Sequence, residues 1–554
     1  MFFSSWGQML GGAALLILTM GGGLAKAAEA PPVPLASGDD GACARLAAAT
    51  IPDTSILSAA IQAAHAPVSG TEDRNGFVAP VPVTGLPAFC RVIGQIRPEP
   101  DSDIRFEVWM PVAQWDHRFH AVGNGGYAGS INYAVMAAAL KAGKATASTD
   151  TGHQDRSTRS GWARGHPARI RDYGWRAIHL TAVAAKRLIA SFYGEKPAYS
   201  YFMSCSNGGR QGLMEANRFP DDFDGILAGD PSAVSSQTIM SMVWTVQAQS
   251  APGAAIRPGQ AGLIRQEVLR QCDAIDGQAD GIIADPRQCR FDVSSLTCGR
   301  SSSSDCFSPP QRDALRKIMA GPPLDRGRIT GFGYPPSGTE LGYPNPGSGW
   351  DGWIFGGVKS PLNHRIFPTG ALQDFATAPY ATVDTFDWTR DPGRLMAAAD
   401  VDQNVRPDLG AFFRRGGKLI LFHGWGDAGN PPQASIQFYQ EMMRQGGGGP
   451  SNARLYMVPG MQHCTGGSGA TEFGQYGERG VPLASDRPDR HIGAALQAWV
   501  EGGRAPEGII ASFAQKGQSV PGRQRLLCPF PQRAVLRSGA DPDRAASYAC
   551  RASN

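Results

Sequence analysis

The 554-residue sequence has no run of Lys and Arg residues that could follow a phosphate backbone. Its 52 basic and 48 acidic side chains leave a formal charge of only +4, which argues against nucleic acid as a partner. We find no internal repeats, so a solenoid or repeat array is excluded. Beyond the N-terminus, no segment reaches the roughly 18 apolar residues that suggest a membrane-spanning helix.

The N-terminus is the exception. An apolar stretch from Met9 to about Leu24 precedes an A-x-A cleavage signal at 25–27. No Lys or Arg precedes the apolar stretch, but we interpret residues 1–27 as a secretory signal peptide. A membrane anchor is the alternative, although the Gly-rich stretch is short for a span. We therefore expect a soluble mature protein, secreted or periplasmic, that has no membrane partner after cleavage.

Glycine and proline are abundant, with 70 and 42 residues. Both exceed the usual shares of roughly 7% and 5%, which indicates many turns and long loops around a compact core. The length suggests two or more domains, or one core with a large insertion.

Expected strands and helices alternate along much of the chain, as in a parallel α/β sheet. The expected strands lie within 106–112, 118–129, 144–155, 197–206, 223–232, 416–427 and 453–464, and the expected helices within 173–193, 208–220 and 434–445.

This regularity fails between about 233 and 405, a segment with four cysteines and Gly/Pro/Trp-rich text. A structureless loop of that length inside one domain would be implausible. We therefore predict an inserted domain at 233–404, with the α/β core divided into 28–232 and 405–554.

The stretch "SCSNG" at 204–208 lies between an expected strand and an expected helix. A nucleophile elbow is usually written G-x-S-x-G, because side chains flanking this strained turn would collide. Here a serine, which is still small, replaces the first glycine. Alone, the motif also fits a Ser-rich turn that caps the helix, but its place between strand and helix favours Ser206 as a nucleophile.

The partners follow in the order nucleophile, acid, histidine that α/β-hydrolases use. Asp427 comes just after one expected strand and His463 just after the next. Asp230 ends the strand after the elbow and remains an alternative acid. His423 lies inside an apolar strand and is interpreted as structural, whereas His153 comes too early to be the base.

In this arrangement His463 takes the proton of Ser206 and Asp427 fixes the tautomer of the imidazole. Two backbone N–H groups must hold the oxyanion. We expect those of Asn207, directly after the nucleophile, and of Gly126 in an earlier Gly-rich loop. For that loop a simple tight turn is the alternative.

Ten cysteines, an even number, fit an oxidising compartment, although their pairing does not follow from sequence. Cys205 precedes the nucleophile and Cys464 follows the expected base. An assembled triad brings these two together, so a Cys205–Cys464 disulfide would join the Ser loop to the His loop. Two unrelated buried thiols are the alternative.

The motifs "CSNGGRQG", "STDTGH", "FHGWGD" and "HC" resemble those of the tannase and feruloyl esterase family, over roughly residues 40 to 550. That family comprises fungal feruloyl esterases, tannases and bacterial mono(hydroxyethyl)terephthalate hydrolases. The resemblance implies an α/β-hydrolase fold whose inserted domain is a lid over the site. It also implies five disulfides: Cys43–Cys90, Cys205–Cys464, Cys272–Cys289, Cys298–Cys306 and Cys528–Cys550.

The segment "CDAIDGQADGIIADPRQC" places three aspartates within eight residues. It is not an EF-hand, because Ala284 stands where a bidentate Glu is needed. A solvated acidic turn is one interpretation. The family resemblance instead implies a structural Ca²⁺ whose ligands are the carboxylates of Asp273, Asp276 and Asp280 and the backbone carbonyls of Gln278 and Ile282.

The resemblance implies a secreted serine esterase that cleaves aromatic-acid esters, feruloyl or galloyl, through an acyl-enzyme. The expected partner is a small aromatic ester or feruloylated or galloylated plant material. A terephthalate monoester hydrolase and an exported ligand-binding protein with an inactive triad are the alternatives. Four lid aromatics are candidates to stack on a substrate ring, although most are expected to be lid core: Trp350, Trp353, Phe355 and Phe375. No pattern in the sequence predicts the oligomeric state.

Overall fold

A computed structural model describes residues 40–74, 77–298, 306–356, 363–376, 381–445, 449, 451–475, 487–515 and 518–552. The expected signal peptide lies outside these residues. Within them, no helix combines the length and the apolar character that crossing a membrane requires. Residues Gly38–Asn554 form one compact unit.

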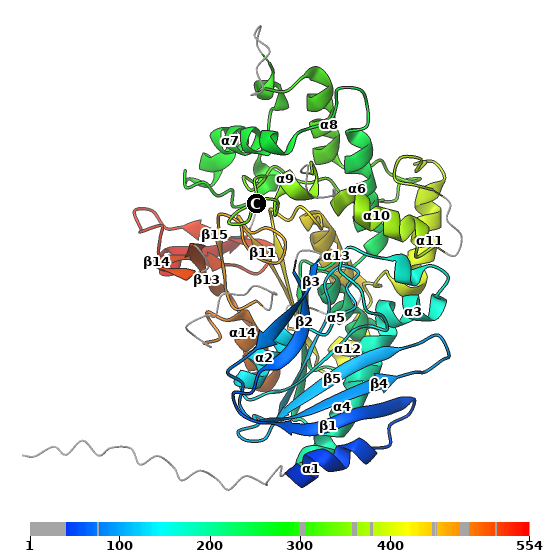
Figure 1. Ribbon diagram of the computed structural model, residues 1–554. Helices are drawn as coiled ribbons and strands as arrows, with labels where there is room; N and C mark the ends of the chain where they lie inside the picture. Colours follow the sequence, from blue (N-terminus) through cyan, green and yellow to red (C-terminus); the bar gives the residue numbers. More distant parts are fainter. Residues whose placement is uncertain are drawn as a thin grey trace, which may run out of the picture. The chain divides into compact units, whose positions relative to one another are not determined.

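A nine-stranded mixed sheet forms the centre of this unit (Figure 1). In spatial order its strands are β1 (Thr54–Gln62), β4 (Phe89–Ile96), β5 (Ile104–Pro111), β7 (Ala145–Thr149), β6 (Arg118–Val122), β8 (Tyr199–Cys205), β9 (Gly225–Gly229), β10 (Lys418–Gly424) and β11 (Ala453–Val458). Neighbours from β7 to β11 run parallel, and β1, β4 and β5 pair antiparallel. The parallel part confirms the α/β fold; β1 and β4 were not expected.

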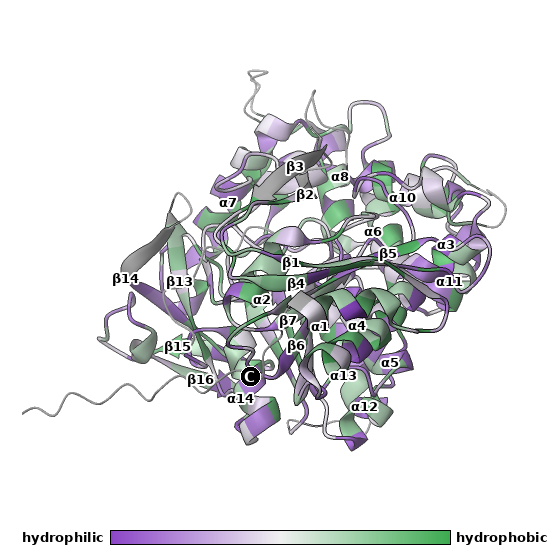
Figure 2. Ribbon diagram, turned by 60° about the horizontal axis from the view of Figure 1, so that its bottom comes forward, coloured by the Kyte–Doolittle hydropathy of each residue, from purple (hydrophilic) through white to green (hydrophobic). Residues whose placement is uncertain are grey.

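The central strands are apolar on both faces because helices cover both. Along β8, Phe202 packs into one core cluster, while Tyr201 and Met203 pack into another on the opposite face. Helices α4 (Ala177–Tyr193), α5 (Asn207–Arg218) and α13 (Pro432–Gln445) contribute buried residues to the first cluster, and α14 (Ile492–Gly502) contributes to the second. The hydrophobic residues of α4 are green in Figure 2.

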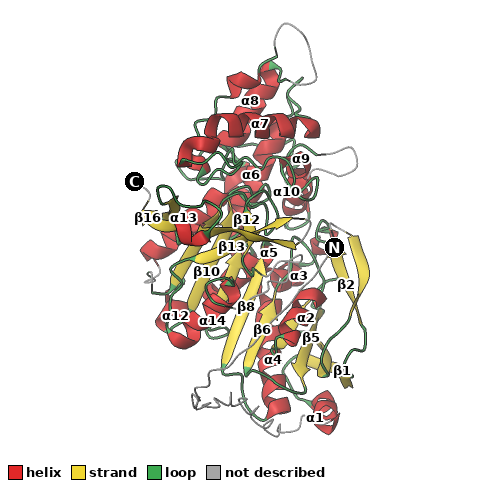
Figure 3. Cartoon of the chain, turned by 90° about the vertical axis from the view of Figure 1, so that its left-hand side faces the viewer, coloured by secondary structure: helices red, strands yellow, loops and turns green. Residues whose placement is uncertain are grey.

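The segment between β9 and β10 is helical in its described part and adds no strand there to any sheet. It contains α6 (Ser235–Ala248), α7 (Ala261–Cys272), α8 (Pro309–Ala320), α9 (Trp350–Trp353), α10 (Asn363–Gln373), α11 (Asp391–Asp402) and α12 (Gly410–Arg414). Figures 1 and 3 show α6 to α10 gathered beyond one end of the strands. The sequence analysis did not predict these helices, which are separated by Gly/Pro-rich segments. The division into core and lid domains stays a prediction.

The remaining elements are smaller. They are α1 (Asp40–Arg45), the hairpin of β2 (Val68–Arg74) and β3 (Phe77–Val83), α2 (Tyr133–Lys141), α3 (Pro167–Arg171), the sheet of β12 (Ala470–Glu472), β13 (Ile509–Gln515) and β14 (Gln518–Leu527), and the pair β15 (Gln532–Leu536) and β16 (Tyr548–Ala552). The helix expected from 173 begins at Ala177, after a π-helical turn at Asp172–Arg176. Apolar spacing does not distinguish the two kinds of turn.

All ten cysteines are paired, and the five disulfides are those that the family resemblance implies. Four of them close loops of at most 47 residues, whereas Cys205–Cys464 spans 259 residues. Of the five disulfides, only this one joins the part of the chain before the segment between β9 and β10 to the part after that segment.

Candidate active site

Ser206 sits in a strained turn between β8 and α5. Its φ of 64° and ψ of −127° are rare for any residue other than glycine. The amide of Ser206 donates to the carbonyl oxygen of Gly229 at 2.9 Å, which ties the turn to β9. The turn therefore points the serine hydroxyl away from the strand end, as a nucleophile elbow requires.

The glycines after Ser206 let α5 approach the sheet closely. A Cβ atom on Gly208 would lie 2.0 Å from the Ser204 hydroxyl, and one on Gly209 would lie 2.5 Å from the Gly229 carbonyl oxygen. Neither contact is sterically possible, so both positions require glycine. The Ser204 hydroxyl occupies the space that a side chain at 208 would need, which accounts for the serine in place of the first glycine of the motif.

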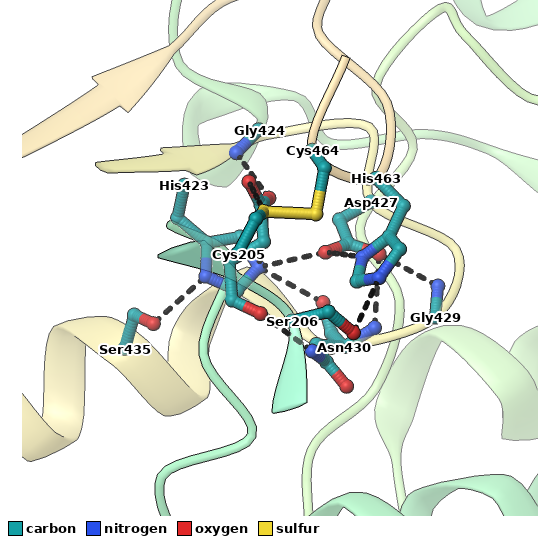
Figure 4. Close-up of a disulfide and its surroundings, with 11 residues drawn as sticks. Cys205, Ser206, His423, Gly424, Asp427, Gly429, Asn430, Ser435, His463 and Cys464 are labelled. Carbon is teal, nitrogen blue, oxygen red and sulfur yellow. Dashed lines mark hydrogen bonds and ion pairs between the residues drawn. A yellow bond between two sulfur atoms is a disulfide. The ribbon is translucent and has the colours of Figure 1, made fainter. Parts of the chain in front are cut away.

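The structure brings Ser206, His463 and Asp427 into one hydrogen-bonded row (Figure 4). His463 Nε2 lies 2.9 Å from Ser206 Oγ, and its Nδ1 lies 2.7 Å from Asp427 Oδ2. The three residues follow the ends of β8, β11 and β10, at one edge of the sheet. This is the geometry in which a histidine accepts the serine proton while the carboxylate fixes its tautomer.

Asp427 is held as a carboxylate. Its Oδ1 accepts hydrogen bonds from the amides of Gly429 and Asn430, at 2.7 and 2.9 Å. Burial favours the neutral acid, but the charge of His463 and the hydrogen bonds from His423 and His463 outweigh it and lower the pKa of Asp427. The group is thus ionised and oriented before any substrate binds.

The Cys205–Cys464 disulfide bridges the residue before the serine and the residue after the histidine (Figure 4). The two Cα atoms lie 6.0 Å apart. Cys464, like Ser206, has a positive φ, of 62°. The bridge therefore links two strained turns, one of which contains the nucleophile and the other of which follows the histidine.

Asp230, the alternative acid, does not take the place of Asp427 beside His463. Its Oδ1 accepts from the Gly424 amide at 2.9 Å and lies 3.7 Å from His423 Nε2. Burial, together with the charge of Asp427, raises the pKa of Asp230 to about 7. Asp230 thus supports the end of β10 from behind the triad.

His423 connects Asp230 to the triad. Its Nε2 lies 3.2 Å from Asp427 Oδ2, the oxygen that also accepts from His463, and 3.0 Å from the Asn430 carbonyl oxygen. Burial favours the neutral ring, but the charge of Asp230 and the hydrogen bond to Asp427 raise the pKa of His423. Because Nε2 faces only acceptors here, it holds a proton, which it donates to the Asn430 carbonyl oxygen beside Asp427.

The two expected oxyanion donors, Asn207 and Gly126, line one pocket together with Ser206 and His463. The Asn207 side chain is bound by Arg210, whose Nε lies 2.7 Å from Asn207 Oδ1. The group of Asn207 that can donate to an oxyanion is therefore its backbone N–H, at the start of α5. Gly126 has a φ of 53°. Its loop is held by the Tyr173 hydroxyl, which donates to the Gly126 carbonyl oxygen at 2.6 Å.

Aromatic rings form much of the pocket wall. Two of the four expected lid aromatics, Trp353 and Phe375, line the pocket, whereas Trp350 and Phe355 are buried in the lid core. The Trp353 ring meets the His463 ring edge-on at 5.3 Å. Among the described lining residues there is no Asp, Glu, Lys or Arg. The pocket thus suits an uncharged, flat, apolar group.

Comparison with known proteins agrees with this site. The family model described as "Tannase and feruloyl esterase" matches residues 90–551. The chain belongs to the tannase and feruloyl esterase family. With the Ser–His–Asp geometry, this membership makes the protein a serine-type carboxylic ester hydrolase.

Individual relatives of this esterase cover most of its length. An uncharacterised esterase of Xanthomonas campestris pv. campestris is 37% identical over 92% of this chain and 91% of its own. The mono(2-hydroxyethyl) terephthalate hydrolase of Piscinibacter sakaiensis is 32% identical over 86% and 87%. The crystal structure of feruloyl esterase B from Aspergillus oryzae superposes with a TM-score of 0.80 at 26% identity and covers 92% of this chain and 100% of that one.

Sequence reasoning missed three aromatic residues of the pocket: Tyr127, Tyr173 and Phe367. Tyr127 directly follows the Gly125-Gly126 loop, and that position was a usable signal. Its hydroxyl donates to the Phe367 carbonyl oxygen at 2.7 Å, which ties the oxyanion loop to α10. For Tyr173 and Phe367 the sequence carried no signal, because only the fold brings their segments to the site.

Residues 273–282, which contain Asp273, Asp276 and Asp280, form an acidic loop at the end of α7. The loop lies within the ring closed by Cys272–Cys289. Asp273 accepts from the amides of Gly281 and Ile282, Asp276 from the amide of Gln278, and one oxygen of Asp280 pairs with Arg525 at 2.6 Å. Burial, followed by the charges of Asp280 and Asp273, raises the pKa of Asp276 to about 6.

The donor chemistry of this loop fits Ca²⁺, which prefers carboxylate and carbonyl oxygens. The crowding of negative charge around Asp276 also favours a cation. However, the three carboxylates are not among the described groups whose ligand atoms all lie within 4.8 Å of one another. The calcium ion expected from the sequence therefore remains a proposal.

Proposed function

We propose that this esterase hydrolyses esters of aromatic carboxylic acids, of the feruloyl (hydroxycinnamoyl) or galloyl type, and that it acts after export, as a secreted or periplasmic enzyme. The observation that carries the proposal is the Ser206–His463–Asp427 row opening into a pocket with aromatic walls and no charged lining residue among those described. The names of the relatives support the same substrate class.

The reaction follows from the positions of these groups. Ser206 Oγ attacks the ester carbonyl carbon as His463 Nε2 takes its proton, and the amides of Asn207 and Gly126 hold the oxyanion. The C–O bond to the alcohol then breaks, and the alcohol leaves with the proton from His463. Water attacks the acyl-enzyme, His463 removes its proton, and that proton returns to Ser206 as the acid departs.

The acyl group is placed by the rings around the serine. Trp353 and Phe367 stack with centroids 6.1 Å apart, and Tyr127 lies 5.3 Å from Phe367. Such a wall binds a planar ring by apolar burial and by ring stacking. Serine hydroxyls and the Gln403 and Asn430 amides also line the pocket and can bond to phenolic hydroxyl groups.

A terephthalate monoester is the second candidate substrate, because a relative is named for hydrolysing one. Its free carboxylate would enter a pocket without a cationic side chain among the described lining residues. Burial of an unpaired carboxylate costs several kcal/mol. We therefore expect kcat/KM for methyl ferulate to exceed that for the terephthalate monoester by about 100-fold or more, since about 2.7 kcal/mol is enough for that ratio.

The test is to assay methyl ferulate, methyl gallate and mono(2-hydroxyethyl) terephthalate side by side, with Ser206→Ala as the control. We expect turnover of a ferulate or gallate ester that Ser206→Ala abolishes. Equal or faster turnover of the terephthalate monoester would refute the proposed substrate class. Binding of these esters with no turnover of any of them would indicate an exported ligand-binding protein instead.

A calcium ion in the acidic loop is part of the proposal. The carboxylates of Asp273, Asp276 and Asp280 and the carbonyls of Gln278 and Ile282 would hold it, and its contribution there is to cross-link the loop. Asp280 also pairs with Arg525 of β14, so the loop connects α7 to the C-terminal sheet. The expected effect of the ion is therefore on stability rather than on the chemical step.

A further inference from the structure

Among the described residues, three groups of His, Cys, Asp and Glu side chains have ligand atoms within 4.8 Å of one another. Two of them are already described. The group of Cys205, Asp230 and Cys464 contains the disulfide, and the group of Asp230, Asp427 and His463 contains two members of the triad. The third lies elsewhere and serves no step of ester hydrolysis: His179, Glu215 and Asp222.

This third group joins three elements on one side of the sheet. His179 is in the first turn of α4, Glu215 is in the last turn of α5, and Asp222 lies between α5 and β9. His179 Nδ1 is 2.6 Å from Asp222 Oδ2. The imidazole is fixed from its other side by the Phe219 ring, which stacks on it at 3.7 Å.

Glu215 is the member to which no described N–H or hydroxyl group donates. Its residue is 1% exposed, and its polar neighbour is the carboxyl group of Asp222. The nearby Lys186 ammonium donates instead to the main-chain carbonyl oxygens of Asp221 and Asp222. A buried carboxylate in this state is costly unless a proton or a cation neutralises it.

We propose that His179, Glu215 and Asp222 bind one divalent cation of the zinc type. One imidazole nitrogen and two carboxylate oxygens are a ligand set that Zn²⁺ accepts, whereas Ca²⁺ and Mg²⁺ prefer oxygen alone. Two carboxylates with a neutral imidazole balance the charge of the ion. The side chains of His179 and Asp222 are 26% and 11% exposed, so the ion can enter from solvent and retain water.

The ion has a structural role. Glu215 follows Ser206 by nine residues on the same helix, or about 13 Å along its axis, which is too far to touch a reacting atom. The ion instead cross-links α4, α5 and the start of β9.

The test is Zn²⁺ titration by calorimetry, with thermal unfolding in parallel, on full-length protein that has been stripped with EDTA and returned to buffer containing CaCl₂. Constant calcium leaves the acidic loop unchanged. The titration is repeated in a His463→Ala background, so that zinc at the triad is not counted. Glu215→Gln keeps the shape of the side chain but removes its charge, His179→Gln tests the nitrogen ligand, and Glu267→Gln, at a surface pair with Arg270, is the matched control.

We expect one Zn²⁺ per chain and a rise in Tm of about 2 °C at 100-fold excess over Kd. Affinity should increase from pH 6 to 8 because binding displaces protons. Glu215→Gln and His179→Gln should each weaken binding at least 10-fold, while Glu267→Gln binds as the wild type does. Equal binding by Glu215→Gln and the wild type, or no saturable Zn²⁺ binding at all, would overturn the proposal.

Discussion

Removal of the Cys205–Cys464 disulfide, by changing both cysteines to alanine, is expected to impair catalysis more than folding. The bridge is partly buried, with Cys205 buried and Cys464 half-buried, and it touches the chain on both sides of the active site. The double substitution leaves the serine, the histidine and the aspartate unchanged. Any loss of kcat therefore reflects a change in the positions of these three side chains relative to one another.

The stabilising effect of the bridge follows from the length of chain that it closes. For a separation of 259 residues, loop-closure entropy gives about 5.6 kcal/mol at 25 °C. Measured effects of disulfides usually fall between about 2 and 5 kcal/mol. Part of the gain is offset by the positive φ angles at Ser206 and Cys464, each of which costs about 1–3 kcal/mol. We expect the free energy of unfolding to fall by about 3 kcal/mol, which still leaves a folded protein.

The effect on rate comes from release of the histidine loop. Without the bridge, residue 464 can leave its left-handed conformation, and His463 then moves away from the 2.9 Å contact with Ser206. A displacement of about 1 Å in such a constellation costs about 100-fold in rate. KM should change by less than about 2-fold, because the aromatic wall of the pocket comes from other segments and this loss concerns the transition state.

The assay is steady-state hydrolysis of methyl ferulate together with urea unfolding, compared with a double alanine variant at Cys298 and Cys306. That control bridge spans 8 residues, is remote from the triad in sequence, and gives about 2.5 kcal/mol by the same entropy estimate. Its removal should lower stability and leave kcat unchanged. A kcat within 2-fold of the wild type after loss of Cys205–Cys464 would refute the reasoning that the bridge positions His463.

Three further predictions concern polar groups. His423→Phe should lower kcat by about 10–100-fold with little change in KM, as expected for loss of the polar group that lies 3.2 Å from Asp427 and donates to Asn430. His423→Gln, which retains an N–H, should recover most of this loss; equal losses in both variants would contradict this. Burial raises the pKa of Asp150 to about 7. The folded protein therefore holds this proton more tightly than the unfolded chain, in which the pKa is about 4. The resulting contribution to the free energy of unfolding is complete below about pH 4 and is lost as pH rises through about 7. Urea unfolding between pH 4 and 8 should show the wild type losing up to about 4 kcal/mol relative to Asp150→Asn, and parallel curves would exclude this. EDTA should lower Tm, and CaCl₂ but not MgCl₂ should restore it. In Asp276→Asn, CaCl₂ should no longer raise Tm. No change in Tm with EDTA would argue against the calcium site.

The triad was predictable because each member is marked by its local sequence. Ser206, Asp427 and His463 each directly follow a short apolar run, and the carboxyl ends of parallel strands meet at one edge of a sheet. The adjacent cysteines added an independent constraint on which histidine pairs with the serine. Strand ends and chain order were thus sufficient, without any knowledge of side-chain packing.

The pocket wall was not predictable in the same way. Tyr173 lies in a π-helical turn, and Phe367 lies on a short helix of the inserted segment. The helical spacing expected from 173 does not show that Tyr173 lies in a π-helical turn, and the segment of Phe367 was not expected to be a helix. The antiparallel strands β1 and β4, at one side of the sheet, were also missed. The lining of the pocket therefore requires the structure, whereas the Ser206–His463–Asp427 row does not.

Asp230 and His423 show what local signals leave undecided, because sequence alone kept Asp230 as an alternative acid and interpreted His423 as structural. Both follow or belong to apolar strands, as catalytic and structural residues alike do. Their roles are decided by distance: Asp427 Oδ2 is within hydrogen-bond reach of His463, and His423 Nε2 lies 3.2 Å from that same oxygen. A carboxylate that accepts from one imidazole and two amides cannot rotate without losing several of these bonds. The orientation of Asp427 thus arises from the Gly429 and Asn430 amides and from His463, with His423, the residue interpreted as structural, next to it.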